Sequence, residues 1–115
     1  VSPEREKAFD MVRQFYVLVD NHFKEKKMVQ DYADMLHRSP KTLSNLFTTC
    51  GLPSPLRIIH ERIEAEAKRL LLYSQKSAKE ITEILGFEDQ ATFSRFFKKM
   101  TGESVSEYRK REKRE

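Results

Sequence analysis

The sequence lacks the features that mark several large classes of protein. Its 115 residues contain a single cysteine, Cys50, so no disulfide can form within the chain. No apolar run approaches the roughly 20 residues needed to cross a bilayer, and the N-terminal stretch VSPEREKAFD does not have the character of a signal peptide. These absences argue against a membrane protein and fit a reducing compartment, so we expect the protein to act in the cytoplasm.

Residue patterns typical of an enzyme or a metal site are also missing. The three histidines and Cys50 fall in separate predicted helices, without the spacing of metal ligands. Residues 60–64, HERIE, approach the zinc-protease pattern H-E-x-x-H, but Glu64 stands where the second histidine is needed. We interpret these residues as surface charges on a helix. We therefore expect no enzyme activity, no catalytic residues, no metal and no cofactor.

Glycine and proline are scarce, with three and four residues respectively. Together with 38% apolar and 35% charged residues, this scarcity indicates a globular, helix-rich chain. A chain of this length forms one small domain, or two very small units that share a core. Apolar residues recur with the period of 3.6 typical of α-helices, and no convincing alternation of period two occurs. The sequence therefore predicts an all-α fold.

Seven helices are expected from this periodicity and from recurring start signals, such as a serine before a proline or three residues before a glutamate. The predicted helices begin at Pro3, cover residues 29–37, run from Pro40 to about Cys50, continue for about 18 residues from Leu56, run from Ser77 to near Gly86, cover residues 90–101, and begin again at Ser104. The apolar stripe of the first helix is predicted to consist of Phe9, Val12, Tyr16, Val19 and Phe23.

A short motif occurs twice in the chain. Residues 42–47 read TLSNLF and residues 92–97 read TFSRFF, with identical Thr, Ser and final Phe and with apolar residues at the second and fifth positions. The likeness extends outward, because Leu36 matches Leu85 and Gly51 matches Gly102, and the offset grows only where turns are predicted. Each copy therefore predicts a short helix, a turn, a second helix and a glycine stop, which is the layout of a helix-turn-helix.

The second helix of each copy has a polar outward face. The residues predicted to be buried are Leu43, Leu46, Phe47, Cys50, Phe93, Phe96, Phe97 and Met100. No large apolar or acidic side chain falls on the outward faces, which carry the side-chain types that read base edges in the major groove of DNA. The candidate base-reading residues are Lys41, Ser44 and Asn45 in the first copy and Gln90, Ala91, Thr92, Ser94 and Arg95 in the second. The candidates for phosphate contacts are Thr48, Lys98 and Lys99.

The net charge of +4 is concentrated at one end of the chain. Residues 1–94 hold 14 basic and 14 acidic residues, whereas residues 95–115 hold eight basic and four acidic residues. A basic end is suited to binding a polyanion, because each cation near a phosphate can release a condensed counterion. For the tail alone, residues 109–115, a solvated end is the plainer interpretation. Arg95, Lys98 and Lys99 differ because they lie in or beside the repeat.

The length of the fourth predicted helix suggests how two readers could work together. About 18 residues give roughly 27 Å of helix, which with its turns is close to the roughly 34 Å between successive major-groove faces of B-DNA. We therefore divide the chain into a first module (1–52), a linker helix (53–74) and a second module with the basic tail (75–115). Because the two copies carry different contact residues, the preferred DNA site should be asymmetric.

Residues 81–109, ITEILGFEDQATFSRFFKKMTGESVSEYR, resemble the C-terminal signature of the AraC/XylS family of bacterial transcription regulators, through G-F, the F-S-R-x-F-K core and the terminal Y-R. LSNLF, GLPSP and RIEAEAKRLL are similar to the family's first module and linker helix. The resemblance covers roughly residues 29–110. It implies a double-stranded DNA-binding domain of two helix-turn-helix modules joined by a long helix, base-reading positions that coincide with the candidates above, and a contact with RNA polymerase.

Three positions depart from the family pattern. Val105 replaces a usual proline, Thr82 replaces a usual alanine, and His37 stands where a turn glycine is common. The first two could alter packing in the fifth and seventh helices, and histidine is among the non-glycine residues that accept positive φ. The chain also begins with Val rather than Met, so we expect a longer protein in which a sensing or dimerising domain precedes Val1.

A helical module that binds another protein is the main alternative to a DNA-binding domain. Such a module would present exposed aromatic or methionine anchors at the repeated motifs. The outward positions instead carry Lys, Asn, Arg, Gln, Ser and Thr. This composition favours DNA as the partner.

Overall fold

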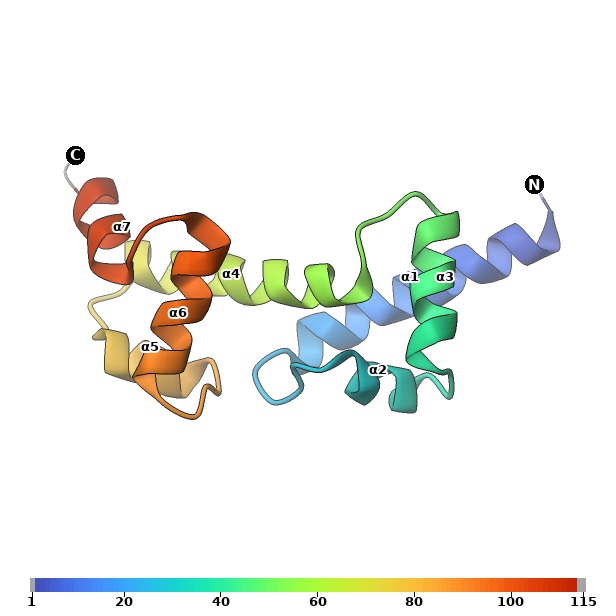
Figure 1. Ribbon diagram of the computed structural model, residues 1–115, viewed down its shortest axis with the longest axis horizontal. Coiled ribbons are helices and arrows are strands. Elements are labelled where there is room, and N and C mark those ends of the chain that lie inside the picture. Colours follow the sequence, from blue (N-terminus) through green and yellow to red (C-terminus); the bar gives the residue numbers. More distant parts are fainter. Residues whose placement is uncertain (1, 114–115) are drawn as a thin grey trace. The chain divides into compact units, whose positions relative to one another are not determined.

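The computed structural model describes residues 2–113 and contains seven α-helices, with no strand in that range. The helices are α1 (Pro3–His22), α2 (Val29–Met35), α3 (Pro40–Thr49), α4 (Pro55–Tyr73), α5 (Ala78–Ile84), α6 (Gln90–Thr101) and α7 (Val105–Glu112). The described chain divides into two compact units, and the boundary lies inside α4, between Arg62 and Ile63. In the first unit α2 and α3 pack on α1, and in the second α6 packs between α5 and α7 (Figure 1). The predicted all-α class is confirmed.

The starts of the helices are held by the side chains that the sequence predicts. Ser2, Ser39 and Ser54 each accept a hydrogen bond from the backbone N–H three residues on, at 3.1 to 3.2 Å. Each of these serines is followed by a proline at the first helical position, where the missing N–H costs nothing. These local bonds explain why three of the helix starts could be located without knowledge of the tertiary structure.

Reciprocal capping boxes open α5 and α7. In α5 the Ser77 hydroxyl accepts the Glu80 N–H at 3.1 Å, while the Glu80 carboxylate accepts the Ser77 N–H at 2.8 Å. Ser104 and Glu107 make the same pair of bonds at 3.1 and 2.8 Å. Hydrogen bonds from the capping serine lower the pKa of each glutamate below its ordinary value of 4.5, because they favour the charged form.

Phe15 of α1 lies at the centre of the first unit's core. Its side chain is fully buried, and its ring centroid lies 5.4 Å from that of Tyr32 in α2 and 5.0 Å from that of Phe47 in α3. The second contact is edge-to-face, with an interplanar angle of 76°, an arrangement that aromatic rings favour. One residue of α1 therefore holds both helices of the first helix-turn-helix.

The buried stripe of α1 differs from the predicted one. Val12, Phe15 and Val19 are buried, whereas Phe9 and Tyr16 are 38% and 40% exposed. The predicted stripe was wrong at these positions because both sets of residues have helical spacing, and the spacing alone does not favour either. The aromatic partners that α2 and α3 bring to Phe15 decide which face of α1 is buried.

α4 is attached to α1 inside the first unit. The Arg62 Nε donates to Asp20 Oδ1 at 2.8 Å, and the guanidinium lies 4.3 Å from the centroid of the Phe23 ring. The helix begins at Pro55, which is buried, whereas Leu56, the predicted first apolar position, is 43% exposed. At 1.5 Å per residue, its 19 residues give a helix of about 28 Å.

Aromatic rings also form the core of the second unit. Phe93 and Phe97 of α6 are fully buried. Phe97 makes an edge-to-face contact with Tyr108 of α7 at 5.4 Å, and Phe93 lies 5.4 Å from Phe87 in the preceding turn. The turn before α6 and the helix α7 after it therefore pack on the same face of α6. The opposite face of α6 is left for solvent.

The turn inside each helix-turn-helix contains one residue with a left-handed backbone. In the first copy this residue is His37, with φ 57°, and in the second it is Gly86, with φ 78°. The Arg38 N–H donates to the Ala33 carbonyl at 2.9 Å, and the His37 N–H donates to the Asp34 carbonyl at 3.2 Å. This pair of bonds ends α2 two residues before the predicted boundary.

The other two departures from the family pattern leave the helices intact. Val105 is buried and is the first residue of α7, and the Ser104 cap precedes it. Thr82 is 3% exposed, and its hydroxyl donates to the Ala78 carbonyl at 2.7 Å, so its buried oxygen has a partner. A hydroxyl is therefore tolerated inside α5 where the family usually has a methyl group.

Replacement of His37 by glycine should raise the free energy of unfolding by about 1 kcal/mol, because glycine adopts the left-handed conformation without the steric cost that a Cβ carries. Urea unfolding followed by circular dichroism measures the change. The matched control is Gly51→Ala, at φ 71°, where an added Cβ would meet no atom within 4 Å. Gly51→Ala should lower the free energy of unfolding by about 1 kcal/mol, because alanine is strained in the left-handed backbone conformation. A destabilised H37G variant would contradict this account of the turn.

Acid should destabilise the second unit through its capping boxes. Because the folded pKa values of Glu80 and Glu107 are lowered, their contribution is present above the ordinary value of 4.5 and is lost as the pH falls below it. Urea midpoints at about pH 6 and about pH 3.5 would measure the loss. The variant E80Q/E107Q keeps an acceptor in each box but no titrating group, so its midpoint should fall less over the same interval. Equal losses in the two proteins would mean that other carboxylates carry the acid sensitivity.

Candidate nucleic-acid interface

The outward face of α3 carries all three of its candidate base-reading residues. Lys41, Ser44 and Asn45 are exposed, while Leu43 and Phe47 on the opposite face are fully buried. Two further residues that were predicted to be buried are half-buried: Leu46 and Cys50. The two buried side chains fix the rotation of α3 about its axis, so the polar residues face solvent together.

The outward face of α6 has the same layout with different residues. Gln90, Ala91 and Arg95 are exposed, and Thr92 and Ser94 are half-buried. The apolar residues of the helix lie opposite, with two fully buried and two half-buried: Phe93, Phe97, Phe96 and Met100. Each unit therefore presents one helix with a continuous polar face, opposite a fully buried phenylalanine, Phe47 or Phe97.

Asp89 and Arg95 both bond to Thr92 at the start of α6. The Asp89 carboxylate accepts the Thr92 N–H at 2.7 Å, and the Thr92 hydroxyl accepts a bond from Arg95 Nη2 at 3.3 Å. Hydrogen bonds from the Thr92 backbone and side chain, followed by the charge of Arg95, lower the pKa of Asp89 below its ordinary value of 3.8. The Asp89 carboxylate and the Arg95 guanidinium therefore both contact Thr92.

The candidate phosphate contacts differ in how readily they could donate to DNA. Lys98 and Lys99 are exposed in the last turn of α6, and both ammonium groups can donate. The Thr48 hydroxyl already donates to the Ser44 carbonyl at 3.0 Å, so a phosphate contact would require that bond to break. Of the three candidates, Thr48 is the least suited to its predicted role.

One further cation, which was not among the candidate residues, lies beside α3. Arg38 is exposed, lies directly before the Ser39 cap, and donates from Nη1 to the neighbouring His37 carbonyl at 3.0 Å. The sequence alone places Arg38 directly before the predicted cap Ser39, so its position beside the first turn of α3 could have been predicted. The corresponding residue before the α6 cap is Glu88, so the two helices begin with opposite charges.

Much of the basic tail is used inside the second unit. Arg109 donates to the carbonyls of Leu71 and Ser74 at 3.1 and 3.4 Å, and Lys113 donates to the Ser74 carbonyl at 3.3 Å. These carbonyls lie at the C-terminal end of α4, where cations satisfy the unpaired acceptors and the negative end of the helix dipole. The two cations therefore attach α7 to α4.

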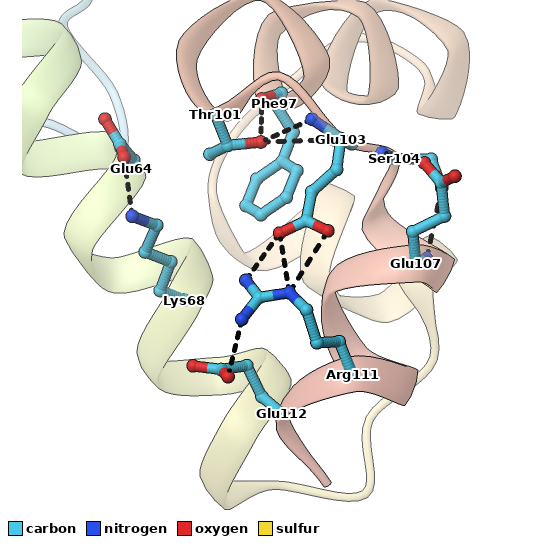
Figure 2. Close-up of polar contacts among 9 residues, drawn as sticks. All are labelled: Glu64, Lys68, Phe97, Thr101, Glu103, Ser104, Glu107, Arg111 and Glu112. Atoms are coloured by element: carbon cyan, nitrogen blue, oxygen red, sulfur yellow. Dashed lines mark hydrogen bonds and ion pairs between the residues drawn. The ribbon is translucent and has the colours of Figure 1, made fainter. Parts of the chain in front are cut away.

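Arg111 is also engaged within the unit. Figure 2 shows its guanidinium between two carboxylates, at 2.5 Å from Glu103 and 2.9 Å from Glu112. The guanidinium also lies 5.4 Å from the ring centroid of Tyr108. The charge count of residues 95–115 thus overstates the cations available to a polyanion. The exposed cations of α6 are the better candidates.

The HERIE segment forms part of α4 and has no features of a metal site. Glu64 pairs with Lys68 one turn further on, at 2.8 Å (Figure 2). Over residues 2–113, no group of three or more His, Cys, Asp or Glu side chains is arranged to hold a metal ion. Over the same range, no helix is long and apolar enough to cross a membrane.

A known family matches most of the chain. The family described as "Helix-turn-helix domain" matches residues 32–111, which include both repeated motifs and the whole of α4. The match therefore extends from α2 to α7 and covers every candidate residue on α3 and α6.

Two curated relatives are transcription regulators. The raffinose operon transcriptional regulatory protein RafR of Pediococcus pentosaceus is 34% identical over 82 residues, which are 71% of this chain and 30% of that protein. The arabinose operon regulatory protein of Salmonella typhimurium is 36% identical over 92 residues, which are 80% of this chain and 31% of that protein. The chain thus matches about a third of the length of these relatives.

A solved structure has the same fold. The C-terminal domain of AraT, a response regulator from Geobacillus stearothermophilus, superposes with a TM-score of 0.78 at 29% identity, covering 88% of this chain and 84% of that one. The family match, the two relatives and this structure together assign the chain: it belongs to the AraC/XylS family of helix-turn-helix transcription regulators and corresponds to their DNA-binding domain.

Proposed function

We propose that the chain binds a specific double-stranded DNA site by inserting α3 and α6 into two successive major grooves. In this proposal Lys41, Ser44 and Asn45 read one half-site. The residues that read the other half-site are Gln90, Ala91, Thr92, Ser94 and Arg95. Lys98 and Lys99 contact phosphates, and Thr48 does so only after its hydroxyl leaves the Ser44 carbonyl.

The observation that carries this proposal is the contrast between the two faces of α3 and α6. Each helix has two fully buried aromatic or leucine side chains on one face and exposed Lys, Asn, Gln or Arg on the other. Amides and guanidinium groups can make paired hydrogen bonds to adenine and guanine. A surface built to bind a protein would instead present apolar anchors, which these outward faces do not carry.

The use of two grooves is supported by α4. Its length of about 28 Å is of the same order as the roughly 34 Å between successive major-groove faces. One chain would then do what a dimer of single helix-turn-helix units does. Because α3 and α6 carry different residues, the two half-sites should differ in sequence.

The role of the whole protein is part of the same proposal. As relatives that are two to three times longer regulate operons, we propose that this domain acts in a transcription regulator of the cytoplasm, with a contact to RNA polymerase and a sensing or dimerising domain elsewhere in the protein. We propose no enzyme activity for the domain, since its candidate residues serve binding.

The variant Arg95→Ala should lose about 1 to 3 kcal/mol of affinity for the specific site and relax the preference at one base pair, because a guanidinium pairs with guanine. Lys98→Ala should weaken binding to all sequences alike and reduce the slope of log affinity against log salt by about 1. Fluorescence anisotropy with specific and scrambled duplexes at several salt concentrations measures both effects.

Lys110→Ala is the matched control, since it removes the same charge from an exposed position of α7. Its affinity should equal that of the parent. If Arg95→Ala bound every duplex as the parent does, α6 would not read bases through Arg95. A nearly flat salt dependence of the parent would favour a protein partner instead.

Selection from a random DNA pool should recover an asymmetric site with two half-sites centred about 10 base pairs apart. Insertion of five base pairs between the half-sites turns one of them to the opposite side of the duplex, so affinity should fall at least about tenfold. Insertion of ten base pairs, as a control, returns both half-sites to the same side of the duplex but does not restore the original distance between them. Recovery of a palindrome or of a single half-site would contradict the two-groove proposal.

A further inference from the structure

Asp89 differs from the caps of the other helices in carrying a charge. Serine caps five helices, through Ser2, Ser39, Ser54, Ser77 and Ser104, with hydrogen bonds of 3.1 to 3.2 Å to the backbone. Asp89 makes the same type of bond to the Thr92 N–H at 2.7 Å. Since serine and aspartate cap helices about equally well, capping alone does not require a carboxylate at the start of α6.

The carboxylate is linked to a residue that lies on the DNA-facing side. The backbone N–H of Thr92 donates to the Asp89 carboxylate at 2.7 Å, and the Thr92 hydroxyl accepts a bond from Arg95 Nη2 at 3.3 Å. The three residues follow one another at intervals of three, so they form a continuous row along α6. The guanidinium of Arg95 is thereby drawn back toward the first turn of the helix.

The equivalent row in α3 is neutral. Ser39 and Thr42 occupy the positions of Asp89 and Thr92, and their hydroxyl oxygens are 2.9 Å apart. Asn45 takes the place of Arg95 in the repeat. The carboxylate and the arginine therefore occur together in one copy and are both absent from the other.

Orientation matters for an arginine that reads a base. Its long side chain samples many rotamers in solution, and only some of them present the planar guanidinium edge to a guanine. In a helix-turn-helix the first turns of the recognition helix approach the base edges most closely. A guanidinium held toward the start of α6 is therefore already near the bases when the helix enters the groove, which lowers the entropic cost of binding.

We propose that Asp89 is a positioning residue for base recognition: its negative charge, beside Thr92, helps the Thr92 hydroxyl to hold the Arg95 guanidinium toward the start of α6. The inference rests on the proposed function, in which Arg95 reads a base pair. The carboxylate also repels DNA phosphates, so it reduces affinity for all sequences while it increases discrimination at the base pair that Arg95 reads.

The variant Asp89→Ser tests the inference, because serine keeps the cap and removes the charge. Binding of the 115-residue chain is measured to the duplex recovered from a random pool and to the same duplex with the base pair read by Arg95 replaced. The ratio of the two affinities should fall about threefold to tenfold in D89S. Affinity for a scrambled duplex should rise about twofold to threefold. Thermal unfolding of D89S and the parent should coincide within a few degrees, since the cap remains.

A double-mutant cycle with Arg95→Ala separates positioning from a structural role. If Asp89 acts through Arg95, D89S should leave the affinity ratio unchanged in the R95A background. An equal loss of discrimination in both backgrounds, or none in the parent, would overturn the inference while the proposed function stands. An R95A variant with the parent's affinity ratio would instead refute the reading role of Arg95 itself.

Ser39→Asp is the matched control in the first unit. It introduces the same carboxylate at the same cap, but Asn45 offers no cation for it to hold. The control should lower affinity for specific and scrambled duplexes alike and leave their ratio unchanged. A change of specificity in S39D as large as that in D89S would mean that a carboxylate at a helix start acts directly on bases, against the inference.

Discussion

Each unit depends on one fully buried aromatic side chain, Phe47 in α3 and Phe97 in α6. Edge-to-face contacts hold both, with Phe15 at 5.0 Å in the first unit and Tyr108 at 5.4 Å in the second. A buried ring of this size fixes the rotation of its helix about the helix axis. The aromatic face of each helix packs against another ring in the core, so the polar face points outward.

Duplication of this arrangement allows the two units to diverge on their surfaces. The positions that pack in the core are constrained in both copies. The exposed positions differ: Asn45 of the first copy corresponds to Arg95 of the second, and Ser39 corresponds to Asp89. A change at an exposed position costs little stability, because few atoms contact it. Each unit can thus acquire its own base preference while the fold is kept.

Charge is used for two separate purposes in the second unit. Arg109 and Lys113 satisfy carbonyls at the end of α4, and Arg111 pairs with two carboxylates, so these cations hold α7 in place. Lys98 lies on the exposed side of α6. Net charge therefore predicts an affinity for polyanions but does not identify the residues that bind them.

The sequence by itself determined the helices, the caps of all but α2, and the outward faces of α3 and α6, because capping bonds and helical periodicity act over three or four residues. It did not determine that α1 buries Phe15 and exposes Tyr16, since both residues fit a helical stripe and only contacts with Tyr32 and Phe47 decide between them. The roles of the tail cations were likewise decided by tertiary structure. Their partners at Leu71 and Ser74 lie more than 30 residues away in the chain, beyond the reach of any local pattern.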